Sequence, residues 1–229
     1  MSASSVQAVT FDVGGTLIQP WPSVGHVYAQ VAARHGISAA ANELDLRFRS
    51  CWTNRTDFNH SRAGWEALVD EVFEGLTPEP PSRTFFPELY AHFAEPGAWR
   101  VFDDVVPALE ALRQAGMKAG IISNWDERLR GLLRKLRLSD CFQVLAISCE
   151  VGAAKPAPAI FHFAASQLGL TPRSILHVGD DPERDVRGAA DAGFRSVQIQ
   201  RTGPWQSGGP LRSLAELPTW IARIEAKSD

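Results

Sequence analysis

The sequence predicts an α/β fold: a Rossmann-like parallel sheet whose first strand is followed by an inserted block of helices. Three observations support this prediction. Short apolar runs recur along the chain, helical periodicity fills the segments between them, and residues 18–99 show helical patterns without such a run. Strands buried on both faces of a parallel sheet are continuously apolar, as these runs are. The predicted α/β core is therefore 1–17 and 100–229, and the inserted subdomain is 18–99.

Five apolar runs are the expected strands, and each is short enough for a strand of a small sheet. They are Val6 to Val13, Lys118 to Ser123, Gln143 to Ser148, Ser174 to Gly179, and Ser196 to Gln200. Helices are expected at Asp103 to Gly116, which ends in a typical C-terminal glycine, and at about Glu127 to Leu138. The second of these helices has leucines on one face and basic residues around the rest, which we interpret as an ordinary solvated face.

The insertion contains up to four helices. Ser23 is a typical N-cap for a helix that Gly36 ends, and the apolar spacing from Trp65 to Phe73 predicts another. The remaining expected elements are two helices at 42–58 and 84–95 and a Pro-rich internal loop at 77–82.

Composition narrows the classes of function. The chain has 229 residues, 45% of them hydrophobic, and its net charge of −3 gives no strong field to recruit nucleic acid or an anionic membrane. The cysteines Cys51, Cys141 and Cys149 are odd in number and form no CxxC pattern, so we expect reduced thiols and neither a disulfide framework nor a zinc site. No apolar segment reaches the ~20 residues that span a bilayer. We expect a cytoplasmic protein that acts on a small molecule.

Polar residues follow the predicted strands where each one ends. The first strand ends at Asp12, the second at Ser123 and Asn124, and the fourth at Asp180, while Lys155 lies in the segment after the third. Each residue alone has an ordinary structural explanation, as a turn, a helix cap or a solvated charge. The carboxyl ends of parallel strands meet at one edge, where ligands bind in such sheets, and the repetition at four strands favours a site.

The residue types indicate which ligands this edge would bind. Asp12 and Asp180 offer the oxygen ligands that Mg²⁺ prefers. Lys155, Ser123 and the backbone N–H groups of the Gly14-Gly15 turn could hold an anion beside the cation. A phosphoryl group suits that combination.

The ordered motifs resemble those of the haloacid dehalogenase-like (HAD) superfamily. They are "FDVGGTL" at residues 11–17, "IISN" at 121–124, "AAKPAPAIF" at 153–161 and "HVGDDPERD" at 177–185. Each motif is short, but their order and spacing cover nearly the whole chain. The helical insertion lies where this family carries a helical cap, and such a cap over the site implies a monomer or a small homo-oligomer.

The resemblance implies a role for each residue. Asp12 would be the nucleophile, and Mg²⁺ would be held by Asp12, Asp180 and the backbone carbonyl of Gly14. Ser123 and Asn124 would bind the transferred group, together with the turn at Gly14 and Gly15. The remaining implied roles are that Lys155 neutralises charge, Thr16 orients the Asp12 loop, and Asp181 or Asp185 supports the metal through water, with a structural role for Asp185 equally open.

Gly14 departs from the family pattern. Phosphatases of the family resemble DxDGT, in which the second Asp protonates the leaving oxygen and then activates water, and general acid–base catalysis is worth typically ~10² to 10⁴ in rate. Phosphonatases use a cap lysine, but the first lysine here is Lys118, beyond the insertion. In 2-haloacid dehalogenases the fourth motif loses its metal-binding acid, whereas "GDDPERD" keeps several acids that would repel a carboxylate substrate unless a cation were present. A 2-haloacid dehalogenase is therefore the less favoured alternative.

Two hypotheses from different classes follow. The first is a Mg²⁺-dependent phosphohydrolase of a small phosphorylated metabolite with a good leaving group, or one in which water, His26 or His60 replaces the missing acid. The second is a catalytically impaired member of the fold that binds phosphorylated ligands or a protein partner. A pure binding protein has no need of the nucleophile, so the presence of Asp12, Lys155 and Asp180 favours an enzyme.

Overall fold

The computed structural model describes residues 5–53, 55, 58–204 and 209–226. These residues form two compact units. The first unit contains the described residues of Met1–Ile18, Val101–Arg130 and Arg137–Asp229, and the second contains those of Gln19–Arg100 and Gly131–Leu136.

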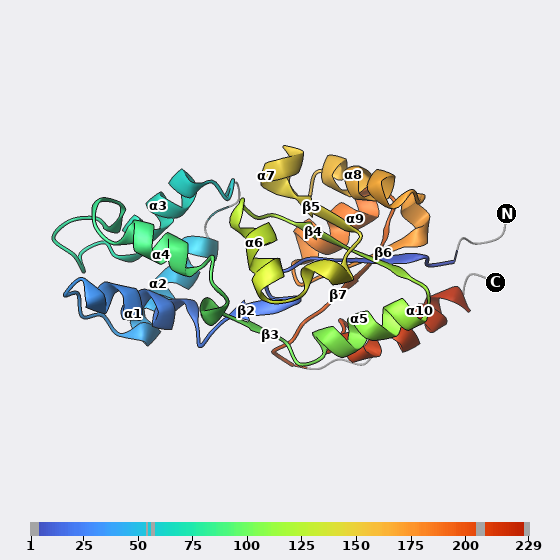
Figure 1. Cartoon of the computed structure of the whole chain (residues 1–229), viewed down its shortest axis with the longest axis horizontal. Coiled ribbons are helices and arrows are strands. Elements are labelled where there is room, and N and C mark those ends of the chain that lie inside the picture. The colour runs from blue at the N-terminus through green and yellow to red at the C-terminus, as the bar shows by residue number, and fades with distance from the viewer. Residues whose placement is uncertain (1–4, 54, 56–57, 205–208, 227–229) are drawn as a thin grey trace. The chain divides into compact units, whose positions relative to one another are not determined.

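The first unit is built on a five-stranded parallel sheet in the order β5-β4-β1-β6-β7 (Figure 1). All five predicted strands are confirmed; β4 has its predicted bounds, and the other strands are shorter than predicted. Their bounds are β1 Ala8–Phe11, β4 Lys118–Ser123, β5 Val144–Ile147, β6 Ile175–Gly179 and β7 Arg195–Gln198. Together with the flanking helices this is the α/β, HAD-like Rossmann-type fold that the sequence predicts.

The register of the central strand brings the strand ends together. Strand β1 is buried along its whole length, and its last residue, Phe11, pairs with Ile121 of β4 and Val178 of β6. Asp12 therefore follows β1 at the level at which β4 and β6 end. This register places the polar residues after the three strands at one edge of the sheet.

Helices cover both faces of this sheet (Figure 1). On one face lie α8 (Pro158–Leu168) and α9 (Gly188–Asp191), which share a buried apolar cluster with the strands. On the other face lie α5 (Val105–Gln114) and α10 (Leu217–Glu225), which contact each other. The two predicted core helices are confirmed as α5 and as α6 (Arg128–Lys135), both a few residues shorter than expected.

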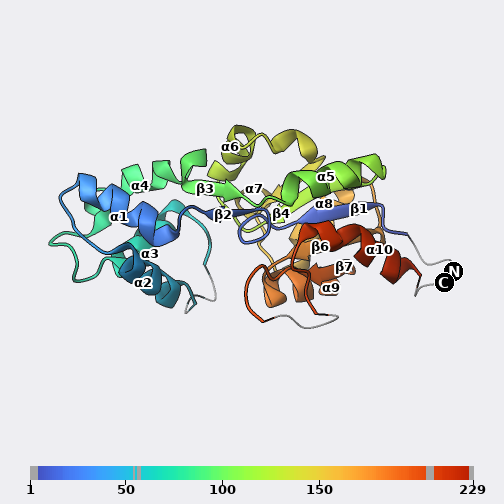
Figure 2. The same ribbon diagram turned by 90° about the horizontal axis from the view of Figure 1, so that it is seen from below.

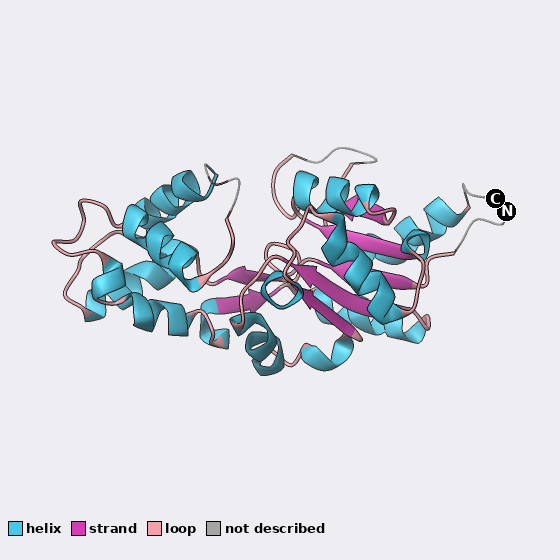
Figure 3. Ribbon diagram, turned by 90° about the horizontal axis from the view of Figure 1, so that it is seen from above, coloured by secondary structure: helices cyan, strands magenta, loops and turns pink. Residues whose placement is uncertain are grey.

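The second unit is helical (Figures 2 and 3). Ser23 is the N-cap of its first helix as predicted, because its side chain accepts a hydrogen bond from the His26 N–H. The helices pack around a buried cluster in which the Tyr28 and Phe73 rings stack with centroids 5.9 Å apart. Their bounds are α1 Val24–Arg34, α2 Ala41–Thr53, α3 Arg62–Val72 and α4 Phe86–His92.

Three details of this unit differ from the prediction. Helix α2 ends at Thr53 and not at 58, since the polar segment after Thr53 has no apolar periodicity; residues 54, 56 and 57 lie outside the described residues. The predicted loop at 77–82 ends in a 3₁₀ turn, η1 (Pro81–Arg83), which its prolines favour. Strands β2 (Ile18–Pro20) and β3 (Trp99–Val101) pair with each other and were missed, because three residues are too short for a periodic signal.

Cys51, Cys141 and Cys149 are all free thiols. Among the helices of the described residues, none has both the length and the apolar character required to cross a membrane.

Candidate active site

The loop after β1 is a tight turn that holds Asp12 at the edge of the sheet. The Asp12 N–H donates to the Val178 carbonyl at 2.9 Å, which extends the β1–β6 ladder to this residue. Beyond it, the Gly15 N–H donates to the Ile18 carbonyl at 2.8 Å, and the backbone of Gly15 has a φ of 72°, a value that favours glycine. The bonds of this turn do not use the Gly14 carbonyl, so that oxygen stays available to a ligand.

The two carboxylate oxygens of Asp12 have different surroundings. Oδ1 accepts hydrogen bonds from Ser123 Oγ at 2.9 Å and from Lys155 Nζ at 2.6 Å. Oδ2 has no hydrogen-bond partner within the described part of the chain. Asp12 is 9% exposed, and burial raises the pKa of its carboxyl against the opposing charge of Lys155. One oxygen is thus held in place while the other can attack an electrophile.

Lys155 lies between two carboxylates. Its Nζ donates to Asp12 Oδ1 and, at 2.5 Å, to Asp185 Oδ1, and the residue is buried. Burial alone would lower the pKa of Lys155, but the charges of Asp12 and Asp185 outweigh it and raise the pKa above its ordinary value. The ammonium group therefore stays charged and neutralises part of the site.

Asn124 fixes the backbone that carries Lys155. Its Nδ2 donates to the Lys155 carbonyl at 2.9 Å, and its Oδ1 accepts from the Lys155 N–H at 2.7 Å. The family resemblance implies that Asn124 binds the transferred group, but these two bonds give its side chain a positioning role that local sequence does not reveal. Any contact between residue 124 and a ligand would therefore be made by atoms that take no part in these two bonds.

A buried histidine supports the far side of Lys155, and sequence reasoning missed it. His177 Nε2 lies 3.2 Å from Asp185 Oδ1, and Nδ1 lies 3.0 Å from Thr10 Oγ1. Burial lowers the pKa of His177, so the ring is neutral at pH 7, and Nε2 carries the proton because a carboxylate oxygen only accepts. The available signal was a polar residue inside the apolar run of β6, ILHVG.

Asp185 is the second carboxylate of this network. Its Oδ2 accepts from the Asp181 N–H at 3.0 Å. Burial would raise the pKa of Asp185, but the Lys155 charge and the His177 hydrogen bond hold it well below its usual range. Gly179 makes this position possible, since a Cβ there would lie 2.1 Å from the Asp185 Cγ. Asp185 is therefore ionised and firmly bound within the protein.

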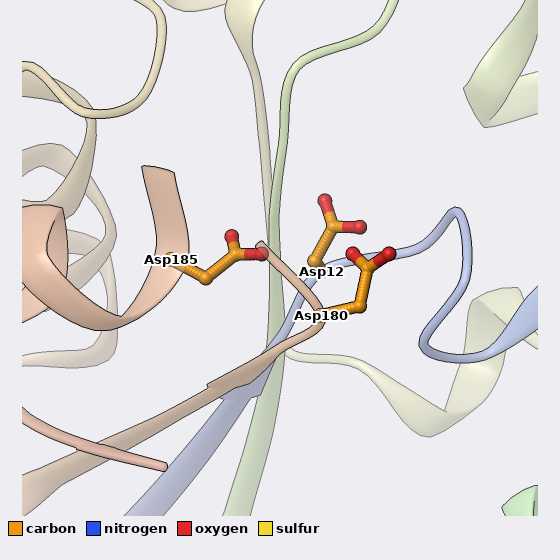
Figure 4. Close-up of side chains that lie close together, drawn as sticks. All are labelled: Asp12, Asp180 and Asp185. Carbon is orange, nitrogen blue, oxygen red and sulfur yellow. The ribbon is translucent and has the colours of Figure 1, made fainter. Parts of the chain in front are cut away.

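Asp12, Asp180 and Asp185 form an acidic cluster in which each offers an oxygen within 4.8 Å of the others. Figure 4 shows that Asp12 and Asp180 come from the ends of β1 and β6, and Asp185 from the short helical segment η5 (Pro182–Arg187) that follows β6. Asp180 is exposed to solvent, yet desolvation of its carboxyl, followed by the charges of Asp12 and Asp185, raises its pKa to about 7. Three carboxylates with one ammonium leave excess negative charge, and an all-oxygen donor set suits a hard divalent cation.

The remaining predicted residues have these positions. Gly15 lies against Asp180, whose Oδ2 would be 2.3 Å from a Cβ built on that glycine. The Thr16 side chain is buried, and its Oγ1 has no partner among the described residues; its carbonyl instead accepts from the Arg201 guanidinium at 2.6 Å. Asp181 lies outside the acidic cluster and caps the turn that follows, accepting from two N–H groups of Glu183 and Arg184.

The two histidines considered as replacement acids belong to the helical unit. His26 contacts its own N-cap, with Nδ1 2.8 Å from Ser23 Oγ. His60 is 7% exposed and packs among the aromatic rings of Trp52, Phe58 and Trp65. Both therefore have local structural roles within their own unit.

The family comparison agrees with this arrangement. The profile of the haloacid dehalogenase-like hydrolases matches residues 6–193, which is most of the chain. This chain is a HAD-like hydrolase. The family assignment made from the four motifs is thereby confirmed, as is the prediction that the protein is an enzyme of the hydrolase class.

Individual relatives of this HAD-like hydrolase match most of its length. It is 30% identical to haloacid dehalogenase-like hydrolase domain-containing protein 3 of Danio rerio, covering 98% of both chains. It is 32% identical to glyceraldehyde 3-phosphate phosphatase of Methanopyrus kandleri, covering 90% of this chain and 88% of the relative. The crystal structure of a HAD phosphatase from Thermococcus onnurineus matches with a TM-score of 0.69 and 29% identity, covering 94% of this chain and 98% of that one.

Proposed function

We propose that this HAD-like hydrolase is a Mg²⁺-dependent phosphohydrolase that acts through an aspartyl-phosphate on Asp12. The observation that supports this proposal most is that Asp12 Oδ2 has no hydrogen-bond partner among the described residues, whereas Oδ1 is held by Ser123 and Lys155. A nucleophile needs one oriented group with an available lone pair, and the two bonds to Oδ1 supply the orientation.

The residues around Asp12 would divide the chemistry as follows. Asp12 Oδ2 attacks phosphorus, and the bond from phosphorus to the leaving oxygen breaks with its electron pair on that oxygen. Lys155, which is charged and buried, stabilises the negative charge on the transferred group. The Gly14 N–H, which donates to no acceptor among the described residues, would bind a phosphoryl oxygen, whereas the Gly15 N–H is already bonded to the Ile18 carbonyl. Ser123 would bind the phosphoryl group by turning its hydroxyl from Asp12 Oδ1. Attack of water on phosphorus then restores the Asp12 carboxylate and releases phosphate.

The acidic cluster fits the cation that this proposal requires. Asp12, Asp180 and the Gly14 carbonyl would hold Mg²⁺, with Asp185 as a further oxygen close by. The ion would supply positive charge against the phosphoryl oxygens and would offset the repulsion between three carboxylates and an anionic substrate. Asp181, which caps a turn, would act only by keeping the β6 loop in place.

The substrate class follows from Gly14 and from the relatives. A small phosphorylated metabolite is supported by the name of the Methanopyrus kandleri relative, glyceraldehyde 3-phosphate phosphatase. Because residue 14 provides no acid, the favoured substrates have leaving groups that depart without a proton, such as aryl or acyl phosphates. The helical unit from Gln19 to Arg100 would serve as the cap that selects the organic part of the substrate.

Phosphate release tests the proposal. The protein is assayed with and without Mg²⁺ on aryl, acyl, sugar and simple alkyl phosphates, beside Asp12→Asn and the surface control Asp140→Asn. We expect Mg²⁺-dependent release that is fastest on aryl and acyl phosphates, abolished in Asp12→Asn and retained in Asp140→Asn. Equal rates for Asp12→Asn and the parent would overturn the nucleophile, and binding without release from any substrate would favour the impaired, ligand-binding alternative.

A further inference from the structure

We propose that Trp125 occupies the space that an acid at position 14 would need, and that its indole is the apolar wall facing the leaving group. The inference rests on the proposed function and names the residue that sets its preference among leaving groups. Trp125 follows Ser123 and Asn124 at the end of β4, so it lies directly beside the Asp12 loop.

The backbone at Gly14 does not demand glycine. Its φ lies outside the left-handed region, in contrast to that of its neighbour Gly15 at 72°. A Cβ built on Gly14 meets one nearby atom, Cζ3 of the Trp125 ring, at 3.4 Å. A methyl group fits at that distance, but a carboxyl group added beyond it must share space with the indole. The size of the side chain, and not the backbone conformation, therefore limits which residue can occupy position 14.

Hydrogen bonds to the main chain of Trp125 hold this residue in position. Ser148 Oγ accepts from the Trp125 N–H at 3.0 Å and donates to the Trp125 carbonyl at 3.1 Å, and the Cys149 N–H donates to the same carbonyl at 3.3 Å. Ser148 is buried at the start of the short helix α7 (Ser148–Val151). A shift of the Trp125 backbone would break these bonds, so only rotation of its half-buried side chain can open the space above Gly14.

The chemistry of the leaving group connects this packing to specificity. When Asp12 forms its bond to phosphorus, the leaving oxygen takes the electron pair of the broken bond. A carboxylic acid at position 14 would give that oxygen a proton, whereas an indole is too weak an acid to do so. Phenolate and carboxylate leaving groups need no proton, and the flat apolar face of an indole packs well against an aryl ring.

Kinetics on matched substrates test this role. The variants are Trp125→Ala, Trp125→Phe, Gly14→Asp and the double variant Gly14→Asp/Trp125→Ala, assayed on aryl and alkyl phosphates. We expect Gly14→Asp alone to gain nothing on alkyl phosphates, whereas the double variant exceeds Trp125→Ala by about 10²-fold, the low end of what an acid supplies. Trp125→Ala loses kcat/KM on aryl phosphates and Trp125→Phe retains most of it.

Two kinetic results would overturn the inference separately from the proposed function. A parent that is active, with Gly14→Asp alone already faster on alkyl phosphates, would show that the indole does not exclude the acid. An unchanged preference for aryl over alkyl phosphates in Trp125→Ala would show that the indole does not contact the leaving group. A parent that releases phosphate from no substrate would overturn the proposed function and this specificity together.

A thermal double-mutant cycle tests the packing without any substrate. Gly14→Ala, whose methyl fits, is the matched control for Gly14→Asp, and each is made with Trp125 present and with Trp125→Ala. We expect Gly14→Asp to lower the unfolding midpoint more in the presence of Trp125 than in its absence, and Gly14→Ala to behave alike in both backgrounds. Equal losses for Gly14→Asp in the two backgrounds would show that the indole does not occupy this space.

Discussion

The two sides of Asp12 contrast, and one of them holds a buried network of Lys155, Asp185 and His177 in which each polar group has a partner. On the other side of Asp12, Gly14 has no side chain and an indole lies against it. In the network, every hydrogen bond holds an ionised or polar atom in position, so this region fixes the charges beside Asp12. The second region provides neither a charge nor a proton at residue 14. The difference suggests that the site can bind and transfer a phosphoryl group, but that it needs a substrate whose leaving group departs without receiving a proton.

The largest effect is expected from removing the charge at the centre of the network. Lys155→Met leaves two buried carboxylates without their cation, which costs about 3–5 kcal/mol of the free energy of unfolding. We also expect a loss of at least about 10² in phosphate release. Urea denaturation and the phosphate assay measure the two effects.

The control for this charge is Lys135→Met. Lys135 forms an exposed ion pair with Glu95, and such pairs contribute only about 0–1 kcal/mol. Similar unfolding midpoints for the two lysine variants would contradict the idea that Lys155 holds the site together.

The close approach of Asp185 to the backbone gives the next largest effect. In Gly179→Ala the new Cβ would lie 2.1 Å from Asp185 Cγ, so we expect a loss of about 1–3 kcal/mol in the free energy of unfolding. Gly131→Ala in α6 is the matched control, because nothing lies within 4 Å of its Cβ and alanine is the better helix former. Equal stability of the two variants would mean that Asp185 can move without cost.

His177→Phe tests the neutral support behind Lys155. Phenylalanine keeps a ring beside Phe161, whose centroid is 5.3 Å away, but it removes the bonds to Thr10 and Asp185. We expect about a tenfold fall in kcat with little change in KM. A tenfold fall in kcat corresponds to about 1.4 kcal/mol of activation free energy. His162→Phe, which loses one bond to the Ala192 carbonyl, should leave kcat unchanged. A parallel fall in both variants would assign His177 to stability alone.

The smallest expected effect is a pH-dependent stabilisation by Mg²⁺. The pKa of Asp180 is about 7 in the folded protein against an ordinary 3.8, so its ionised form is disfavoured by folding and metal-free stability falls as pH rises through 7. Mg²⁺ held as proposed would bind the ionised form, and it should raise the thermal midpoint more at pH 8 than at pH 6, by about 2–4 °C for each kcal/mol of added stability. Asp180→Asn should remove that difference; a pH-independent shift in the parent would contradict the role of Asp180.

The sequence was sufficient for the fold and for which residues meet at the sheet edge. Asp12 and Asp180 directly follow strands, Ser123 ends one, and Lys155 lies in the segment after another, and parallel strands carry such residues to one edge whatever the details of packing. The three-residue strands β2 and β3 could not be found, because hydrophobic alternation needs more residues than they contain.

The partners of these residues could not be predicted. Asn124 bonds to Lys155, which is 31 residues away, and His177 in β6 bonds to Asp185 in η5. Trp125 lies against Gly14 although the two are far apart in the sequence. Contacts between distant segments depend on side-chain rotamers, which no local pattern encodes.

The central claim is covalent transfer of phosphate to Asp12, and rapid-quench mass spectrometry tests it most directly. The protein is mixed with Mg²⁺ and an acyl phosphate, quenched in acid within the first turnovers, and digested. Because no carboxylate at position 14 activates the attacking water, the account predicts that one phosphoryl group accumulates on the peptide containing Asp12, that hydroxylamine removes it, and that Asp12→Asn lacks it. Steady release of phosphate with no adduct on that peptide, and at the same rate in Asp12→Asn, would contradict the account.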